Sequence, residues 1–105
     1  MNLVFKALSD PTRRQVLELL RKGPMSAGDL AERFDVSKPT MSAHFATLRK
    51  AGLIVSERQG KSIVYELQLS VLEDALLGFA RMFGWKLQDD KRAAPKPSRR
   101  EVESE

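Results

Sequence analysis

The first half of the chain alternates short amphipathic segments with helix breakers. Residues 2–8 place apolar side chains at helical spacing, and residues 11–21 repeat that pattern. Asp10 is a good N-cap, and Pro11 suits the first helical position because its missing N–H costs nothing there. A Gly-Pro pair at 23–24 ends the second segment. The pattern predicts two helices separated by a sharp break.

Two further short helices are expected next, joined by a tight turn. Ser26 followed by Asp29 resembles a capping box and opens a helix that ends near Asp35. Ser37 can cap the following helix, which runs to about Ala51 and is terminated by a glycine. The two helices therefore form a helix-turn-helix.

The helix that begins at Ser37 has one apolar and one polar face. Met41, Phe45 and Leu48 are spaced at i, i+4 and i+7 and should face the core. A set of polar or small side chains near its start should lie off the core side: Ser37, Lys38, Thr40, Ser42, Ala43 and His44. Such a helix can enter the major groove of DNA and offer hydroxyl groups to base edges. A merely solvated surface is the alternative explanation of the same residues.

A β-hairpin is expected after this helix. Residues 53–57 and 62–68 are rich in β-branched side chains, and the second stretch alternates apolar with polar positions. Gln59-Gly60-Lys61 supplies the turn between them. Arg58 and Lys61 then lie at the hairpin tip, where they can contact flanking phosphates or the minor groove of DNA, or remain solvated charges.

A last helix and a charged tail complete the predicted order. Ser70 and Glu73 have capping-box spacing and open a helix through about Leu87. The apolar content of that helix is unusually high: Val71, Leu72, Ala75, Leu76, Leu77, Phe79, Ala80, Met82, Phe83 and Trp85. Residues 88–105 carry many charges of both signs, which predicts a disordered tail. We therefore expect one domain over residues 1–87.

Composition narrows the class of protein. A chain of 105 residues with 42% hydrophobic and 30% charged residues suits one soluble domain. It has no cysteine, which excludes disulfides, thiolate nucleophiles and thiolate metal sites. The single histidine, His44, has no carboxylate at a spacing that suggests a triad, so we expect no enzymatic activity. Neither a basic leader nor an apolar run of ~20 residues is present, which predicts a cytoplasmic protein without membrane insertion.

Positive charge is concentrated in one window. The chain carries a net charge of +4, and residues 36–62 alone hold five basic residues against the single acid Glu57. The basic residues are Lys38, Arg49, Lys50, Arg58 and Lys61. The window covers the helix that begins at Ser37 and the hairpin tip, so it favours a nucleic-acid partner over a protein partner.

Four stretches carry a resemblance to a known family. Residues 5–14, the pair Leu30-Ala31, residues 37–45 and residues 48–54 look like the arsenic-repressor (ArsR/SmtB) family of winged helix-turn-helix repressors. Within that family the chain resembles the metal-independent SdpR-like autorepressors, which share the Val-Phe-Lys-Ala start and the Ser-Lys-Pro opening of the helix after Ser37.

The resemblance implies both a fold and a mode of action. The fold would be mainly α with a small β-hairpin, in the order α-α-α-α-β-β-α, forming a homodimer through the first and last helices. The dimer would repress transcription by binding a palindromic operator in double-stranded DNA, with half-site centres ~34 Å apart. The residues expected at the dimer interface are Leu3, Val4, Leu72, Leu76, Phe79 and Phe83.

The chain departs from the family's metal sensors. Many relatives bind metal through a Cys-Val-Cys motif, and the corresponding positions here are Ser26, Ala27 and Gly28. Others use Asp and His pairs in the last helix, which has no histidine in this chain. Because one imidazole cannot build a site of three or four ligands, we expect no metal and no other cofactor.

The sequence also allows two other interpretations of its last helix. The apolar last helix could bind a protein partner such as an anti-repressor, and the aromatic residues Phe83 and Trp85 could line a pocket for a small ligand that gates DNA binding. We expect Arg13 and Arg14 to serve structure, by pairing with acids on their own helix, rather than DNA.

Overall fold

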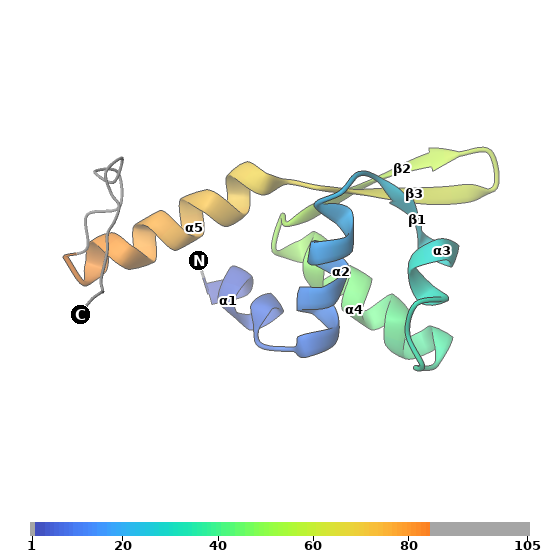
Figure 1. Cartoon of the computed structure of the whole chain (residues 1–105), viewed down its shortest axis with the longest axis horizontal. Helices are drawn as coiled ribbons and strands as arrows, with labels where there is room; N and C mark the ends of the chain where they lie inside the picture. The colour runs from blue at the N-terminus through green and yellow to red at the C-terminus, as the bar shows by residue number, and fades with distance from the viewer. Residues whose placement is uncertain (1, 85–105) are drawn as a thin grey trace, which may run out of the picture. The chain divides into compact units, whose positions relative to one another are not determined.

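The computed structural model describes residues 2–84. Its elements are α1 (Asn2–Leu8), α2 (Pro11–Leu20), β1 (Met25–Ser26), α3 (Ala27–Ala31), α4 (Lys38–Lys50), β2 (Ile54–Gln59), β3 (Ser62–Leu67) and α5 (Leu69–Met82), as Figure 1 shows. The chain divides into two parts between Glu73 and Asp74, within α5. The predicted division at residues 87 and 88 and the charged tail lie outside the described residues.

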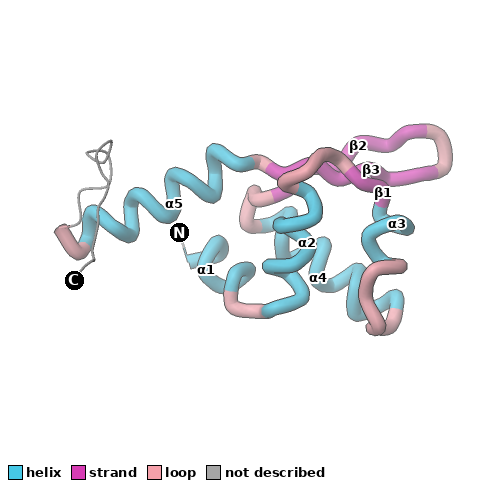
Figure 2. The backbone as a smooth tube through the Cα atoms, viewed as in Figure 1, coloured by secondary structure: helices cyan, strands magenta, loops and turns pink. Residues whose placement is uncertain are grey.

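The expected fold class, mainly helical with a small hairpin, is confirmed. One strand is added to the predicted order: β1 pairs with β3, so the sheet has three antiparallel strands in the order β1-β3-β2 (Figure 2). In the first part of the chain, α2, α3 and α4 lie on one side of this sheet (Figure 1). The most deeply buried large side chains come from α2, α3, α4 and the start of β2: Val16, Leu30, Met41, Leu48, Leu53 and Ile54.

Helix starts follow local capping chemistry. Three of the four expected caps form, each a side-chain oxygen that accepts a backbone N–H three residues on: Asp10 from Arg13 at 3.1 Å, Ser26 from Asp29 at 3.0 Å, and Ser37 from Thr40 at 3.3 Å. Each satisfies one of the N–H groups that have no partner inside a helix. These caps set where α2, α3 and α4 begin.

Three expected helix boundaries are wrong. Helix α3 ends at Ala31 rather than near Asp35, because the N–H groups of residues 33 and 34 bond carbonyls only three residues back, which tightens the chain into turns. Helix α5 begins at Leu69, so Ser70 lies inside the helix and does not cap it. The same helix ends at Met82, earlier than predicted.

The end of α4 is a Schellman motif built on Gly52. The N–H of Gly52 bonds the carbonyl of Arg49 at 2.9 Å, and the N–H of Leu53 bonds the carbonyl of Leu48 at 3.1 Å. Gly52 has a φ of +77°, in the left-handed region that a residue with a Cβ enters only at a cost. This turn delivers the chain from α4 directly into β2.

Replacement of Gly52 tests this turn. A Cβ at this position would meet its nearest neighbour, a methyl group of Val71, at an ordinary 3.8 Å, so the cost of Gly52→Ala is conformational. We expect the free energy of unfolding to fall by about 1–2 kcal/mol in urea denaturation. Gly28→Ala is the control: Gly28 is helical with open space around it, and alanine there should stabilise by up to about 1 kcal/mol. Equal effects of the two substitutions would contradict the proposed strain.

Candidate nucleic-acid interface

Helix α4 presents a solvent-exposed polar row beside a fully buried apolar one. The exposed fractions of Met41, Phe45 and Leu48 are 2%, 5% and 0%, so these residues face the core as predicted. Among the residues expected off the core side, five are exposed: Ser37, Lys38, Thr40, Ser42 and Ala43. We call α4 the reading helix and these five residues its exposed row.

The first turn of the reading helix is tightly organised. The hydroxyl of Ser37 accepts the N–H of Thr40 and donates its proton to Thr40 Oγ1 at 2.9 Å. Because a hydroxyl has one proton, Ser37 is committed to the cap, whereas Thr40 keeps its own proton for another acceptor. Pro39, in the first turn, needs no partner for a missing N–H. The first turn therefore has a defined geometry before any ligand arrives.

Aromatic and polar contacts fix the reading helix against the sheet. The rings of Phe45 and Tyr65 lie 4.7 Å apart, centroid to centroid, and Arg49 donates to the hydroxyl of Tyr65 at 3.3 Å. Tyr65 sits on the central strand β3, opposite Ser56 of β2. Tyr65 therefore contacts the reading helix both through its ring and through its hydroxyl, and joins that helix to the hairpin.

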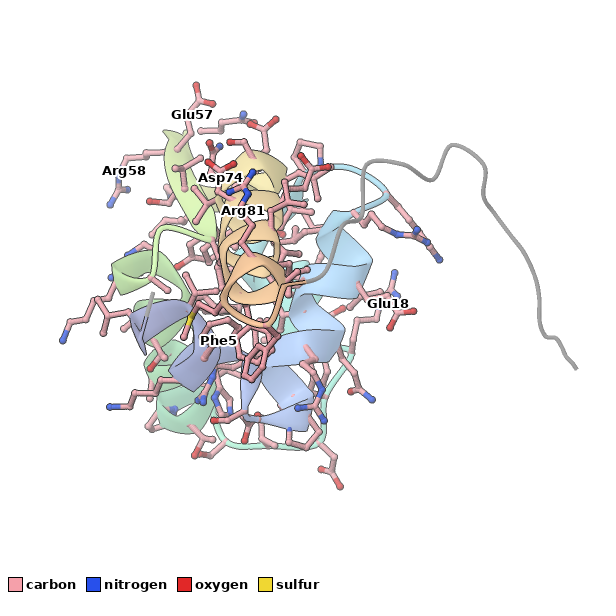
Figure 3. All side chains as sticks on the ribbon, turned by 90° about the vertical axis from the view of Figure 1, so that its left-hand side faces the viewer. Phe5, Glu18, Glu57, Arg58, Asp74 and Arg81 are labelled. Atoms are coloured by element: carbon pink, nitrogen blue, oxygen red, sulfur yellow. The ribbon has the colours of Figure 1, made fainter. Side chains whose placement is uncertain are left out.

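The hairpin places cations on an exposed strand and turn. Arg58 lies near the end of β2 opposite Ile63, and Lys61 lies in the turn after Gly60, whose φ of +62° suits glycine. All of β2 after Ile54 is exposed, as is the turn. Figure 3 shows the side chains of Glu57 and Arg58 extending outward from the hairpin. These cations are available to an anionic partner.

A groove lies between the reading helix and the sheet. It has a volume of about 400 Å³ and is bounded by α3, α4 and β3. Polar side chains from α4 line it, namely Lys38, Ser42 and Arg49, together with apolar groups such as Met41 and Ile63. Ser42 therefore belongs both to the exposed row of the reading helix and to the lining of this groove.

His44 lies differently from the exposed row. Its side chain is only 13% exposed, with Nε2 3.8 Å from Asp10 Oδ2 and Nδ1 3.2 Å from Arg13 Nη1. Both ring nitrogens thus face the start of α2 rather than solvent. The helical periodicity placed His44 off the core side, and the structure brings it into a cluster of three side chains.

Asp10 is the acidic member of that cluster. Desolvation raises its pKa, but the hydrogen bond from the Arg13 N–H and the charges of His44 and Arg13 outweigh it and hold the pKa below its ordinary value. A carboxyl whose pKa is lowered by folding stabilises the fold at pH values above its unfolded pKa. That contribution is lost as the pH falls through the folded pKa.

Substituting Asp10 by asparagine separates charge from capping. Asparagine caps helices about as well as aspartate, so Asp10→Asn should retain α2 while removing the charge. We expect the variant to have a lower free energy of unfolding than the wild type at pH 7, and the gap to close as the pH falls below about 4. Denaturant unfolding of both proteins across pH 2–7 measures this difference in the free energy of unfolding. A gap of constant size over that range would show that the charge is irrelevant.

Arg13 and Arg14 have the structural role that was expected, but with other partners. Instead of acids, they bind the last carbonyls of α1: Arg13 Nε donates to Ala7 O at 2.8 Å, Arg13 Nη2 to Lys6 O at 2.9 Å, and Arg14 Nη1 to Leu8 O at 2.7 Å. Carbonyls at a helix end have no partner within the helix, and cations favour that end. The two arginines therefore cap α1 from the side of α2.

The residues expected at a dimer interface differ in exposure. Leu3, Leu76, Phe79 and Phe83 are 54%, 46%, 38% and 61% exposed, whereas Leu72 is half-buried. Val4 is only 6% exposed and belongs to the core of the protomer, because α1 packs against α2 and α4. The rings of Phe79, on α5, and Phe83, in the turn after it, lie 5.0 Å apart. Trp85 lies outside the described residues.

The described residues give little basis for a metal site. Ser26, which the resemblance aligns with a cysteine of the metal sensors, caps α3 by accepting the N–H of Asp29. Within residues 2–84 there is no group of three or more histidine, aspartate and glutamate side chains that could hold a metal ion. Over the same range, no helix is long and apolar enough to cross a membrane.

Comparisons with known proteins agree with this geometry. A family model described as a helix-turn-helix domain matches residues 8–57. The transcriptional repressor SdpR of Bacillus subtilis is 51% identical over 76 residues, which cover 72% of this chain and 84% of that protein. An arsenical resistance operon repressor of Staphylococcus aureus is 34% identical over 76 residues, covering 72% and 73%.

Solved structures show the same architecture. The crystal structure of an ArsR family transcriptional regulator matches with a TM-score of 0.67 and 31% identity, and the match covers 81% of this chain and 91% of that one. An ArsR-like transcriptional regulator from Rhodococcus sp. RHA1 matches with a TM-score of 0.70 and 33% identity, covering 78% and 77%. The chain therefore belongs to the ArsR family of winged helix-turn-helix transcriptional regulators, which are not enzymes.

Proposed function

We propose that this protein is a homodimeric, metal-independent repressor that binds a palindromic operator in double-stranded DNA. The observation that carries the proposal is the exposed row of the reading helix, which the contact of Phe45 with Tyr65 fixes against the sheet and which adjoins a hairpin with a basic tip. A rigid helix with exposed short polar groups can place hydroxyls at base edges. The basic window of residues 36–62 supplies the attraction to phosphates.

Each residue of this surface has a specific role in the proposal. Thr40, Ser42 and Ala43 face base edges in the major groove, with Ser42 and Thr40 offering hydroxyls and Ala43 a methyl group. Ser37 and Lys38 lie at the start of the reading helix, where N–H groups and a cation favour a phosphate. Arg58 and Lys61 bind flanking phosphates from the hairpin. His44, expected among the base readers, is assigned here to the cluster with α2.

The proposed dimer uses the exposed apolar residues of α1 and α5. Leu3, Leu76, Phe79 and Phe83 are more exposed than large apolar side chains usually are in a monomeric domain, and Leu72 continues the row. Two-fold pairing of these surfaces would place the two reading helices in successive major grooves, ~34 Å apart. The dimer should therefore select half-sites related by two-fold symmetry. We further propose that the protein works in the cytoplasm without a cofactor, and that its own promoter is one of its targets.

Selection of bound sequences from a random pool of double-stranded DNA tests the function. We expect a palindromic consensus with half-site centres about one turn of DNA apart. Analytical ultracentrifugation at micromolar concentration should give the mass of a dimer. A chelator such as EDTA should leave operator binding unchanged. A monomer that selects an asymmetric site would overturn the symmetric arrangement.

A protein partner on α5 is the second candidate function. The exposed fractions of Met82, Phe83 and Leu76 on α5, 70%, 61% and 46%, provide an apolar surface that an anti-repressor could bind. If the random pool yields no enriched sequence, the chain is an interaction module that has kept the winged fold. If it yields a palindrome, the exposed α5 residues serve the dimer first.

A further inference from the structure

Arg13 connects three helices through one guanidinium group. Two of its nitrogens donate to the carbonyls of Ala7 and Lys6 at the end of α1, and a third, Nη1, lies 3.2 Å from His44 Nδ1 on the reading helix. The guanidinium itself belongs to the start of α2. It is therefore a polar link, beside the apolar packing of α1 on α4, between the end of α1 and the helix that carries the exposed row.

The chemistry of this link fixes the state of the histidine. A guanidinium has five N–H donors and no acceptor, so in the neutral imidazole His44 Nδ1 is the acceptor and the ring proton is on Nε2. His44 Nε2 lies 3.8 Å from Asp10 Oδ2, and the same carboxylate oxygen caps α2 by accepting the N–H of Arg13. Both nitrogens of the imidazole therefore face residues at the start of α2, and Nδ1 is within hydrogen-bond distance of Arg13.

We propose that Arg13 and His44 are positioning residues, which set the orientation of the reading helix relative to α1 and do not contact DNA. The proposal rests on the proposed function, because it assigns α4 to DNA. It also separates His44 from Ser42, which lies two positions earlier and is exposed. His44 affects DNA binding through Arg13, whereas Ser42 acts on bases directly.

A double-mutant cycle on operator affinity distinguishes the two roles. Arg13→Gln and His44→Ala should each weaken operator binding about tenfold, and the double variant should also lose about tenfold rather than a hundredfold, because both substitutions break the same link. Arg13→Gln combined with Ser42→Ala should instead lose the product of the two single effects. The substitution His44→Ala should weaken binding evenly across operator variants, without changing the preferred base at any position.

Two further variants separate a positioning role from a general loss of structure. His44→Asn keeps an acceptor where Nδ1 lies and should hold operator affinity within about threefold of the wild type. Arg14→Gln removes the same charge and a similar contact to α1, at Leu8 O, but in the described part of the chain Arg14 has no hydrogen bond to α4. It should leave operator affinity within about threefold as well.

The outcomes decide between the proposals. Additive losses for Arg13→Gln and His44→Ala, or a changed base preference in His44→Ala, would overturn the positioning role and restore His44 as a base reader. A wild-type chain that enriches no DNA sequence would overturn the proposed function instead. In that case the same double-mutant cycle, measured as the free energy of unfolding in urea, tests the contact between Arg13 and His44 by itself. Coupling between the two substitutions supports the contact, and strict additivity overturns it.

Discussion

Phe45→Ala should lower the free energy of unfolding by about 3–5 kcal/mol, the largest effect that we expect from any single substitution in this chain. Phe45 is 5% exposed on the buried face of the reading helix, and its ring lies 4.7 Å from that of Tyr65. The substitution removes a large apolar side chain, leaves a cavity and deletes the aromatic contact that joins helix to sheet. Because small domains are stable by only about 5–15 kcal/mol, much of the stability would be lost.

Urea denaturation followed by circular dichroism measures this loss. Phe34→Ala is the matched control, because Phe34 is an aromatic residue of the turn after α3 that is only half-buried. It should cost about 1–2 kcal/mol, in proportion to the apolar area that it covers. Phe45→Leu keeps most of the buried volume and should fall between the two. If Phe34→Ala were as damaging as Phe45→Ala, the core would not be centred on the contact between α4 and β3.

Helix starts could be predicted because capping is a local interaction. Asp10, Ser26 and Ser37 each bond an N–H only three residues away, so the sequence within one turn contains all the partners. The buried face of the reading helix followed from spacing alone for the same reason, since Met41, Phe45 and Leu48 lie within two turns.

The errors arose where distant parts of the chain compete with local signals. Ser70 and Glu73 have capping-box spacing, but the N–H of Gln68 bonds the carbonyl of Leu53 and the N–H of Val71 bonds the carbonyl of Gln68, so the chain turns before Ser70. Strand β1 has only two residues, which pair with Tyr65 and Val64 almost forty positions away. Neither interaction leaves a pattern in its own segment.

His44 shows the same limit at the candidate site. Its place on the helix put it beside the exposed row, and only the fold reveals that Arg13, 31 positions earlier, occupies its Nδ1. A histidine that follows Ser42 by two residues gives no local sign of that partner. The exposure of Ser42 and its neighbours was therefore predictable from the sequence, whereas the contacts of His44 required the structure.

Ser42→Ala should weaken operator binding by about 1–3 kcal/mol and relax the preference for one base pair, the second of the two largest effects. Ser42 is exposed on the reading helix, beside the groove bounded by α3 and β3, and its hydroxyl can both donate to and accept from a base edge. Alanine removes both functions but preserves the helix, so unfolding free energy should change little. Titration of wild-type and variant protein against operators substituted at each position measures affinity and preference together.

Lys61→Ala provides the contrast, because Lys61 lies exposed in the hairpin turn and binds the sugar-phosphate backbone in the proposed complex. Its loss should weaken binding evenly across all operator variants and reduce the slope of log affinity against log salt by about 1. The two substitutions thus predict opposite signatures: a change in base preference without a change in salt slope for Ser42, and the reverse for Lys61.

If Ser42→Ala bound every operator as the wild type does, base reading would have to be assigned to Thr40 and Ala43. If Ser42→Ala instead lost affinity evenly with a lower salt slope, Ser42 would be a phosphate contact, and the reading helix would lie across the groove rather than in it.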